Sequence, residues 1–344
     1  MDDVANSRAG SVTLEDVARE AGVSLATASR VLNGSTRTVA ESYRKRVDAA
    51  AAKLGYTANL SAQATARGTS AVIALLVADI ADPYFGELAA GVARGADNAG
   101  MVVTIAITDR DPGRELRLVR TLRGLRPRGV ILAASRTARE DNAELSRQLD
   151  LVRVAGGRAV ALGTGPELAR IVRVDNRGGA HDLAVELGRL GYRDAVVLAA
   201  AEGVVTSDQR LDGFIEGFTS TGGSSPRVYR GEFSRESGTE LMTRALADGI
   251  TEGTVVFGIS DVVAIGAISA IRALDREVGT DIAVCGFDDI PASRDVTPAL
   301  TTVRVPLEQL GCDAFLAATE AEWHQNHEAS RVAVHIREST PTRP

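Results

Sequence analysis

Side chains suited to contact a nucleic acid lie close together in the run S-L-A-T-A-S-R-V-L-N, between Ser24 and Asn33. The guanidinium of Arg30 can donate two hydrogen bonds to a guanine edge, whereas Leu25 and Ala26 can contact thymine methyl groups. The hydroxyl and amide groups suit phosphate contacts, which set the register of a complex without reading its sequence. The candidates for these phosphate contacts are Ser24, Thr27, Ser29 and Asn33.

Two short helices are predicted to present these side chains. The first follows Thr13, which forms an imperfect capping box with Asp16, and it ends at Gly22, which can adopt the left-handed conformation. Ser24 caps the second helix. The apolar residues recur with helical spacing, so each helix buries one face. They are Leu14, Val17, Ala18 and Ala21 in the first helix and Ala28, Val31 and Leu32 in the second. Two helices joined this tightly predict a helix-turn-helix, whose second helix enters the DNA major groove.

A third helix is predicted from Thr38 to Leu54, and its buried residues would complete a small core. They are Val47, Ala50, Ala51 and Leu54, with Tyr56 beyond the helix. From Ser11 to Gly68 the chain has eight Lys or Arg and five Asp or Glu, a net charge of +3, whereas the whole chain carries −6. A basic segment on an acidic body indicates that only the first part meets a polyanion.

This segment resembles the N-terminal motif of LacI/GalR-family transcriptional regulators. The resemblance rests on V-T-L-E-D-V-A-R-E-A-G-V-S-x-x-T-x-S-R-V-L-N, followed by A-A-x-x-L-G-Y and Asn59. Further family landmarks extend it over about Val12 to Ser339. They are D-P-Y-F (82–85), V-D-N-R-G-G-A (174–180), R-L-D-G-F (210–214), G-E-F-S-R-E-S-G (231–238), G-F-D-D-I-P (286–291) and L-T-T-V-R-V-P-L (300–307).

The resemblance implies DNA contacts beyond the second helix. Tyr43, where the family tends to have Thr, and Arg44 would lie near phosphates. Asn59, Ala62 and Thr65 would belong to a short hinge helix that pairs with its copy over the minor groove. Such a short helix is marginal in isolation and should form only when docked. Because Thr65 replaces the usual Leu wedge, we expect weaker kinking of the operator.

From Ala71 onward, short apolar runs alternate with amphipathic helices. The runs are continuous and rich in β-branched residues, as expected for parallel strands covered on both faces. They are A-V-I-A-L-L-V, M-V-V-T-I-A-I, G-V-I-L-A, A-V-A-L, I-V-R-V, A-V-V-L-A, T-V-V-F-G and I-A-V-C-G-F, with predicted helices that include Tyr84 to Ala99, Gly178 to Leu190 and Val262 to Arg272. They are too many for one sheet and predict two lobes.

The expected fold is an N-terminal all-α helix-turn-helix head plus an α/β core of two doubly wound parallel-sheet lobes, as in periplasmic binding proteins. The expected domains are residues 11–58 for the head, 59–69 for the hinge and 70–339 for the core. The family fold implies that the chain crosses between lobes near Leu162, Pro291 and Trp323. Lobe 1 would comprise about 70–162 and 292–322, and lobe 2 about 163–291 and 323–339.

A candidate effector site follows from this architecture, because open α/β sheets bind ligands outside the carboxyl ends of their strands. Carried over from the family, Tyr84 or Phe85 would stack on the ligand, Arg210 would make a charge-assisted contact, and Asp288 would accept hydrogen bonds. The other lining candidates are Asp82, Phe233, Ser260 and Asp261. Asp82, Asp261 and Asp288 could equally well cap a helix or turn instead.

The chemical class of the effector is open at this point. Carboxylates with an aromatic platform suit a sugar or sugar-derived metabolite, which is the leading hypothesis, whereas an Arg with two Phe could hold a purine or an acid. Gly163-Thr164-Gly165 stands where many sugar-responsive relatives have an acidic residue, which argues against a simple hexose.

Other functions find less support. The sequence contains no nucleophile elbow, phosphate-binding loop, dinucleotide-binding glycine motif or H-E-x-x-H motif, so we expect no catalytic residues and no cofactor. His324 and His327 have helical spacing, but no Cys or carboxylate cluster joins them, so no metal site is expected. The alternative function is a two-lobed solute-binding receptor or an enzyme with an incidental helical head.

Composition favours a cytoplasmic protein. Cys285 and Cys312 are isolated, as suits a reducing compartment, and no apolar run is long enough to span a membrane. The N-terminus is polar and acidic, unlike a signal peptide. The expected partners are a double-stranded DNA operator of pseudo-palindromic sequence, a small-molecule effector and a second copy of the chain. No heptad tail follows the core, which favours a dimer over a tetramer.

Overall fold

The computed structural model describes residues 12–32, 39–57, 69–137, 143–323 and 329–343. The chain divides into two compact units, Met1–Ser70 and Ala71–Pro344.

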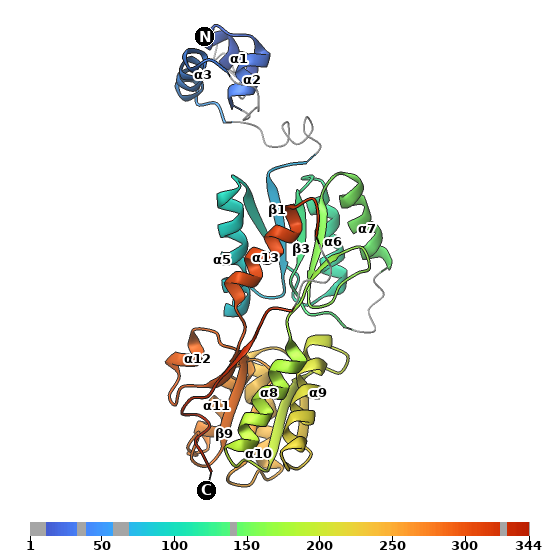
Figure 1. Cartoon of the computed structure of the whole chain (residues 1–344), viewed down its shortest axis with the longest axis vertical. Coiled ribbons are helices and arrows are strands. Elements are labelled where there is room, and N and C mark those ends of the chain that lie inside the picture. The colour runs from blue at the N-terminus through green and yellow to red at the C-terminus, as the bar shows by residue number, and fades with distance from the viewer. Residues whose placement is uncertain (1–11, 33–38, 58–68, 138–142, 324–328, 344) are drawn as a thin grey trace, which may run out of the picture. The chain divides into compact units, whose positions relative to one another are not determined.

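Within its described residues, the first unit contains the helices α1 (Leu14–Ala21), α2 (Leu25–Leu32) and α3 (Glu41–Leu54), as Figure 1 shows. The predicted capping box is present, because Thr13 and Asp16 each accept a hydrogen bond from the backbone N–H of the other. Gly22 has a φ of 60° and ends α1 in the left-handed conformation, as predicted. The hydroxyl of Ser24 accepts from the backbone N–H of Thr27 at 3.1 Å and so caps α2.

The core of this unit confirms the predicted helical faces. Its fully buried residues are Val17, Ala18, Ala21, Ala28, Val47, Ala50 and Ala51, and the partly buried residues packed on them are Val12, Leu14, Val23, Val31, Leu32, Leu54 and Tyr56. Arg46 of α3 donates to the carbonyl oxygens of Ala21 and Gly22 and so satisfies the end of α1. Most of these core residues are small, so the three helices pack closely.

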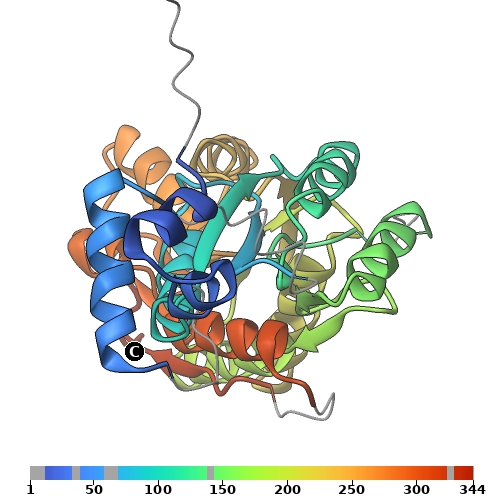
Figure 2. The same ribbon diagram turned by 90° about the horizontal axis from the view of Figure 1, so that it is seen from above.

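The second unit begins with a five-stranded parallel sheet in the order β2-β1-β3-β4-β5. The strands are β1 (Val72–Val77), β2 (Val102–Ile107), β3 (Gly129–Leu132), β4 (Arg158–Leu162) and β5 (Arg170–Val172). Helices α5 (Pro83–Asn98) and α13 (Leu307–Thr319) pack together on one face, and α6 (Pro112–Arg123) and α7 (Ala143–Val154) lie on the other, as Figure 2 shows. Alternate residues of β1 enter the two cores, with Ile73 in one and Ala74 in the other.

The second lobe is a six-stranded sheet in the order β11-β10-β9-β8-β6-β7. Its strands are β6 (Ala195–Ala200), β7 (Arg227–Gly231), β8 (Val255–Gly258), β9 (Ala283–Asp288), β10 (Thr301–Arg304) and β11 (Ala333–His335). Four of its helices form two packed pairs, and a short helix, α12 (Ala292–Asp295), follows β9. The pairs are α8 (Asn176–Arg189) with α9 (Val205–Ser220) and α10 (Arg235–Ala247) with α11 (Asp261–Ala273). All neighbours pair in parallel except β10 and β11, which are antiparallel.

Two of the expected lobe crossings are wrong. The first lies after Val172 rather than near Leu162, because β5 adds its backbone hydrogen bonds to β4 in the first sheet. The second lies after Arg304 rather than near Pro291, because β10 pairs with β9 in the second sheet. The third passage lies between the end of α13 at Thr319 and the start of β11 at Ala333.

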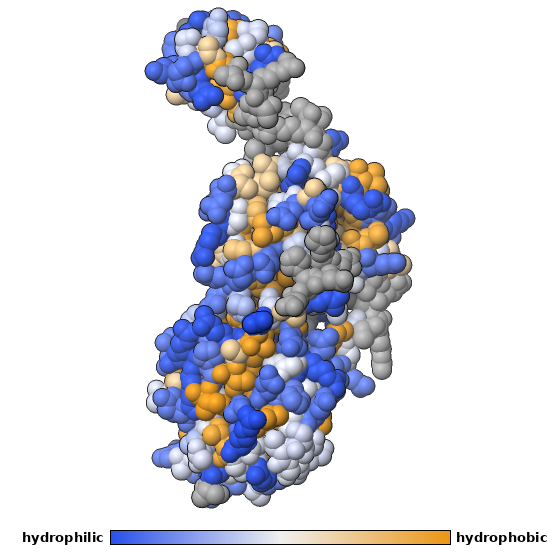
Figure 3. Space-filling view, viewed as in Figure 1, coloured by the Kyte–Doolittle hydropathy of each residue, from blue (hydrophilic) through white to orange (hydrophobic). Residues whose placement is uncertain are grey.

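On the visible face of the two lobes, apolar residues gather in a band along the second lobe and in smaller groups on the first, bordered by polar residues (Figure 3). Among the residues that the structure describes, no helix is long and apolar enough to cross a membrane.

Candidate functional sites

The first candidate site is the outer surface of α2. Leu25, half of whose surface is accessible, lies beside Ala26 and Arg30, and all three side chains are exposed. The hydroxyls of Ser24 and Thr27 lie 2.8 Å apart and hydrogen-bond to each other, and Ser29 is half-buried. The helix therefore presents two apolar side chains and one cation on one exposed surface.

The third helix adds Tyr43 and Arg44, both exposed. The guanidinium carbon of Arg46 lies 5.7 Å from the centroid of the Tyr43 ring, so this cation packs on the aromatic face while it caps α1. Four predicted DNA contacts, Asn33, Asn59, Ala62 and Thr65, lie outside the described residues.

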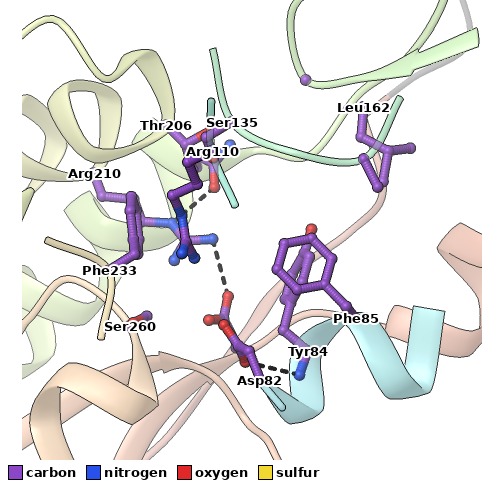
Figure 4. Close-up of a pocket in the computed structure, with 14 residues that line it drawn as sticks. Asp82, Tyr84, Phe85, Arg110, Ser135, Leu162, Thr206, Arg210, Phe233 and Ser260 are labelled. Carbon is purple, nitrogen blue, oxygen red and sulfur yellow. Dashed lines mark hydrogen bonds and ion pairs between the residues drawn. The ribbon is translucent and has the colours of Figure 1, made fainter. Parts of the chain in front are cut away.

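The second candidate site is a cleft between the two lobes, with a volume of about 570 Å³ including its opening to solvent. Figure 4 shows Tyr84 and Phe85 on one side of this cleft and Arg110, Arg210 and Phe233 on the other. The lining residues come from the carboxyl ends of strands in both sheets and from the loops and helices that follow those strands, as predicted for an open α/β fold. They are Asp82, Tyr84, Phe85, Arg110, Ala133, Ser135, Leu162, Gly163, Asn176, Thr206, Arg210, Phe233, Ser260 and Asp288.

Arg210 is held by the second lobe on several sides. Its Nε donates to Oδ1 of Asn176, its Nη1 to the carbonyl of Ile259 and its Nη2 to Oδ1 of Asp288, each at 2.9 Å. The guanidinium also stacks on the ring of Phe287, 3.8 Å from its centroid. Only 3% of Arg210 is exposed, so this side chain is fixed before any ligand arrives.

The carboxyl groups of the cleft are in unusual environments. Burial raises the pKa of Asp288 to about 7, although Arg210 opposes the shift. Asp288 also has a φ of 117°, a strained conformation that is characteristic of functional positions. Asp82 caps α5, since its Oδ1 accepts from the backbone N–H of Tyr84 at 3.0 Å, and burial raises its pKa. Burial likewise raises the pKa of the Tyr84 hydroxyl, which therefore stays protonated.

The lobes are in direct contact beside the cleft, where the backbone N–H of Val205 donates to the carbonyl oxygen of Arg136 at 3.0 Å. The hydroxyl of Ser135, after β3, donates to that of Thr206 on α9 at 3.0 Å. Arg110, after β2, places its guanidinium carbon 5.6 Å from the ring centroid of Phe233, which follows β7. The cleft thus has first-lobe and second-lobe groups in direct contact.

Ser260 and Asp261, adjacent in the sequence, behave differently. The hydroxyl of Ser260 is buried in the cleft wall and has no hydrogen-bond partner within the described residues. Asp261 does not line the cleft, contrary to the expectation from sequence. Its carboxylate accepts from the backbone N–H of Ile290 at 2.9 Å and from the hydroxyl of Thr302 at 2.6 Å, which fixes α11 to the end of β9 and to β10.

The sequence interpretation missed several lining residues that follow the same rule. Arg110 and Ser135 come after predicted strands, so the rule for carboxyl ends would have found them. Asn176 lies within the V-D-N-R-G-G-A landmark, and Thr206 lies in the first turn of α9. No group of His, Cys, Asp and Glu suited to a metal ion occurs among the residues described.

A helix-turn-helix head on a two-lobed α/β core with an interlobe cleft defines a class of transcription regulators. The family described as bacterial regulatory proteins of the lacI family matches residues 13–59, and the periplasmic binding protein-like domain matches residues 184–340. The HTH-type transcriptional repressor CytR of Escherichia coli (strain K12) is 31% identical over 307 residues, covering 88% of each chain. The chain belongs to the LacI family of transcriptional regulators.

Solved structures agree with this assignment over nearly the whole length. The lac repressor dimer bound to operator and the anti-inducer ONPF has a TM-score of 0.79 at 27% identity, covering 96% of this chain and all of that one. The complex of the transcriptional regulator CelR with cellobiose has a TM-score of 0.66 at 29% identity, covering 95% of this chain and 99% of that one. These relatives are regulators, not enzymes.

Proposed function

We propose that the chain is a repressor that binds a pseudo-palindromic operator as a dimer and responds to a small metabolite in the interlobe cleft. The observation that carries this proposal is the exposed surface of α2 together with a polar cleft in the same chain. The repressor CytR and the operator-bound lac repressor dimer support the DNA-binding half. Because its target is DNA, such a repressor acts in the cytoplasm.

On the DNA, α2 would read bases. Arg30 would bind a guanine, and Leu25 and Ala26 would contact thymine methyl groups. The remaining candidates would contact phosphates or the minor groove. They are Ser24, Thr27, Ser29, Asn33, Tyr43, Arg44, Asn59, Ala62 and Thr65. The domain limits proposed for these roles are 11–58 for the head, 59–69 for the hinge and 70–339 for the core.

In the cleft, Tyr84 and Phe85 would stack on the ligand while Asp82 and Asp288 accept from its hydroxyl groups. The CelR complex with cellobiose supports a sugar or sugar-derived metabolite. The ligand would act by population shift, since it changes DNA affinity only if it binds two arrangements of the lobes unequally.

The DNA half is tested by Arg30→Ala in the full-length protein, on an operator obtained by binding-site selection. We expect a loss of about 1–3 kcal/mol on the selected site and a relaxed preference at one base pair. Arg44→Ala is the matched control, because loss of a phosphate contact should weaken binding equally for all sequences. Unchanged discrimination between the selected site and random DNA in Arg30→Ala would refute base reading by this residue.

The ligand half is tested by repeating the selection with candidate small molecules, chosen by a thermal-shift screen of sugars, nucleobases and small acids. A compound that stabilises the protein should change its affinity for the operator. If stabilising compounds leave operator affinity unchanged, the cleft does not regulate DNA binding.

A further inference from the structure

Arg110 brings to the cleft a guanidinium that no carboxylate neutralises. Within the described residues it forms no hydrogen bond and no ion pair, and its contact is with the ring face of Phe233, 5.6 Å away. Burial lowers the pKa of Arg110, while Asp82, Asp79 and Glu232 oppose the shift from beyond ion-pair distance. Arg110 as a whole is an exposed residue.

The other cation of the cleft is already paired. Arg210 donates to Asp288 at 2.9 Å, with 4% and 6% of their side chains exposed. Asp82 holds the start of α5 through Tyr84 and forms no ion pair within the described residues. Among the described residues that line the cleft, Arg110 is therefore the cation whose N–H donors remain available to a ligand.

The backbone directs Arg110 to this position. Asp109 and Arg110 have φ values of 52° and 56°, so two successive non-glycine residues adopt the left-handed conformation directly after β2. Such conformations are unfavourable and persist where the surrounding structure requires them. Arg110, the second residue of this turn, lines the cleft.

We propose that the effector carries an anionic group, a carboxylate or a phosphate, which Arg110 binds at the Phe233 end of the cleft. This inference rests on the proposed function, because it specifies the ligand of the same cleft. The rest of the ligand is a polyol, whose hydroxyl groups donate to Asp82 and Asp288 and bind the unpartnered hydroxyl of Ser260.

The chemistry favours an anion over a neutral sugar at Arg110. A guanidinium offers five N–H donors in a planar fork that matches two oxygens of a carboxylate or phosphate. A single hydroxyl would occupy one or two donors and leave the charge uncompensated. Phe233 covers one face of the guanidinium, so its edge is the side that remains open for an anion.

The opposite side of the cleft supports the same assignment. Gly163, which lines the cleft after β4, brings no side chain and has free space where a Cβ would be. No carboxylate therefore stands at that position to repel an anionic ligand. The cleft can hold one added negative charge at Arg110.

The experiment is isothermal titration calorimetry of the full chain with three related ligands for each of the sugars glucose, galactose, mannose and ribose. The three ligands are the neutral sugar, its uronic or aldonic acid and its terminal phosphate, all measured at one ionic strength. We expect the tightest ligand to be an acid or a phosphate, and Arg110→Gln to weaken it at least tenfold. The acid and phosphate arms show which anion the site takes. Arg110→Lys, which keeps the charge but loses the fork, should fall between wild type and Arg110→Gln.

Arg117→Gln is the matched control, since it removes one positive charge from an exposed residue of α6 that does not line the cleft. It should leave every affinity unchanged. The proposal is overturned if the tightest ligand is a neutral sugar, if Arg110→Gln binds the anion as wild type does, or if no anion in the panel binds. The melting temperature of Arg110→Gln should match that of wild type, because Arg110 has no hydrogen bond to lose.

The two proposals fail separately. An anion that binds through Arg110 without changing operator affinity would support this inference and refute the ligand response. A neutral sugar that changes operator affinity would support the ligand response and refute this inference.

Discussion

The two walls of the interlobe cleft differ in how far their charged groups are already paired. On the second-lobe wall, Arg210 makes three hydrogen bonds and stacks on Phe287. On the first-lobe wall, Arg110 makes none within the described chain, and Asp82 binds only the backbone of α5. On the second-lobe wall the charged groups are already hydrogen-bonded to each other, whereas on the first-lobe wall they can still form hydrogen bonds or ion pairs with a ligand.

This difference indicates a division of labour. A paired, buried network holds its geometry without a ligand and so lowers the conformational cost of binding. Unpaired groups on the first lobe gain most from a ligand, so they can provide the unequal affinity that shifts the lobes. The second lobe would then position the ligand, while the first lobe responds to it.

Replacing Arg210 should produce the largest effect. In Arg210→Ala, Asp288 keeps its burial but loses its cation, and three buried hydrogen bonds are lost. Removal of one partner of a buried pair typically destabilises a protein by about 3–5 kcal/mol. The measurement is the free energy of unfolding of the full chain in urea, taken from the unfolding transition of the second unit.

Arg110→Ala is the contrasting variant, because a side chain without partners should cost less than about 0.5 kcal/mol when it is shortened. Equal destabilisation by the two variants would show that the walls do not differ. Loss of the ligand response in Arg210→Ala would by itself be uninformative, since unfolding could cause it.

The contribution of Asp288, on the second-lobe wall, to folding stability should depend on pH. Its folded pKa of about 7 lies above the ordinary value of 3.8, so the folded chain keeps a proton that the unfolded chain releases. This contribution to stability is present at low pH and is lost as the pH rises through 7. Between pH 5 and pH 8 the loss is about 3 kcal/mol, because the folded chain holds the proton over about two pH units, from 5 to 7, at about 1.4 kcal/mol per unit.

In Asp288→Asn this part of the pH dependence should disappear, because the amide mimics the protonated carboxyl and still accepts from Arg210. Asp261 and Asp82, whose pKa values burial also raises, remain as a common background. The measurement compares the unfolding free energy of both proteins at pH 5 and pH 8. Identical declines would mean that Asp288 does not titrate in this range.

Most of the fold was predictable because its signals are local. The eight apolar runs correspond to β1 to β6, β8 and β9. In the head, the helical spacing of apolar residues and the caps predicted the helices and their buried faces. The strands that were missed lack a continuous apolar run. β7 is an edge strand with Val228 partly exposed, and β10 is rich in Thr, whose buried hydroxyls are satisfied by hydrogen bonds.

The cleft was only partly predictable, because the role of a polar residue depends on partners far away in sequence. Ser260 lines the cleft whereas Asp261 binds Ile290 and Thr302, and no local pattern separates these neighbours. Of the adjacent carboxyls at the end of β9, Asp288 lines the cleft, while Asp289 pairs with Arg294 and Arg337. Both residues have a positive φ, 117° and 56°, so a turn of the backbone and not strand alternation separates their side chains.

Ser260 is the exception to the contrast between the walls, and it gives the smallest effect. It belongs to the second-lobe wall, yet its buried hydroxyl has no partner in the described chain. Ser207, also buried in the second lobe, accepts from the backbone N–H of Ala200 at 2.9 Å. The two serines therefore form a matched pair that differs in hydrogen bonding.

Ser207→Ala should cost about 1–3 kcal/mol, because it leaves a buried N–H without an acceptor. Ser260→Ala should change stability by less than about 0.5 kcal/mol, since no partner is stranded. It should instead weaken the tightest ligand of the titration panel by about 0.5–1.5 kcal/mol, the usual net value of one hydrogen bond. If Ser260→Ala destabilises the chain as Ser207→Ala does and binds ligand normally, the hydroxyl of Ser260 serves the stability of the second lobe and not ligand binding. The contrast between the walls would then hold without exception, and the ligand would have one contact fewer on the second lobe.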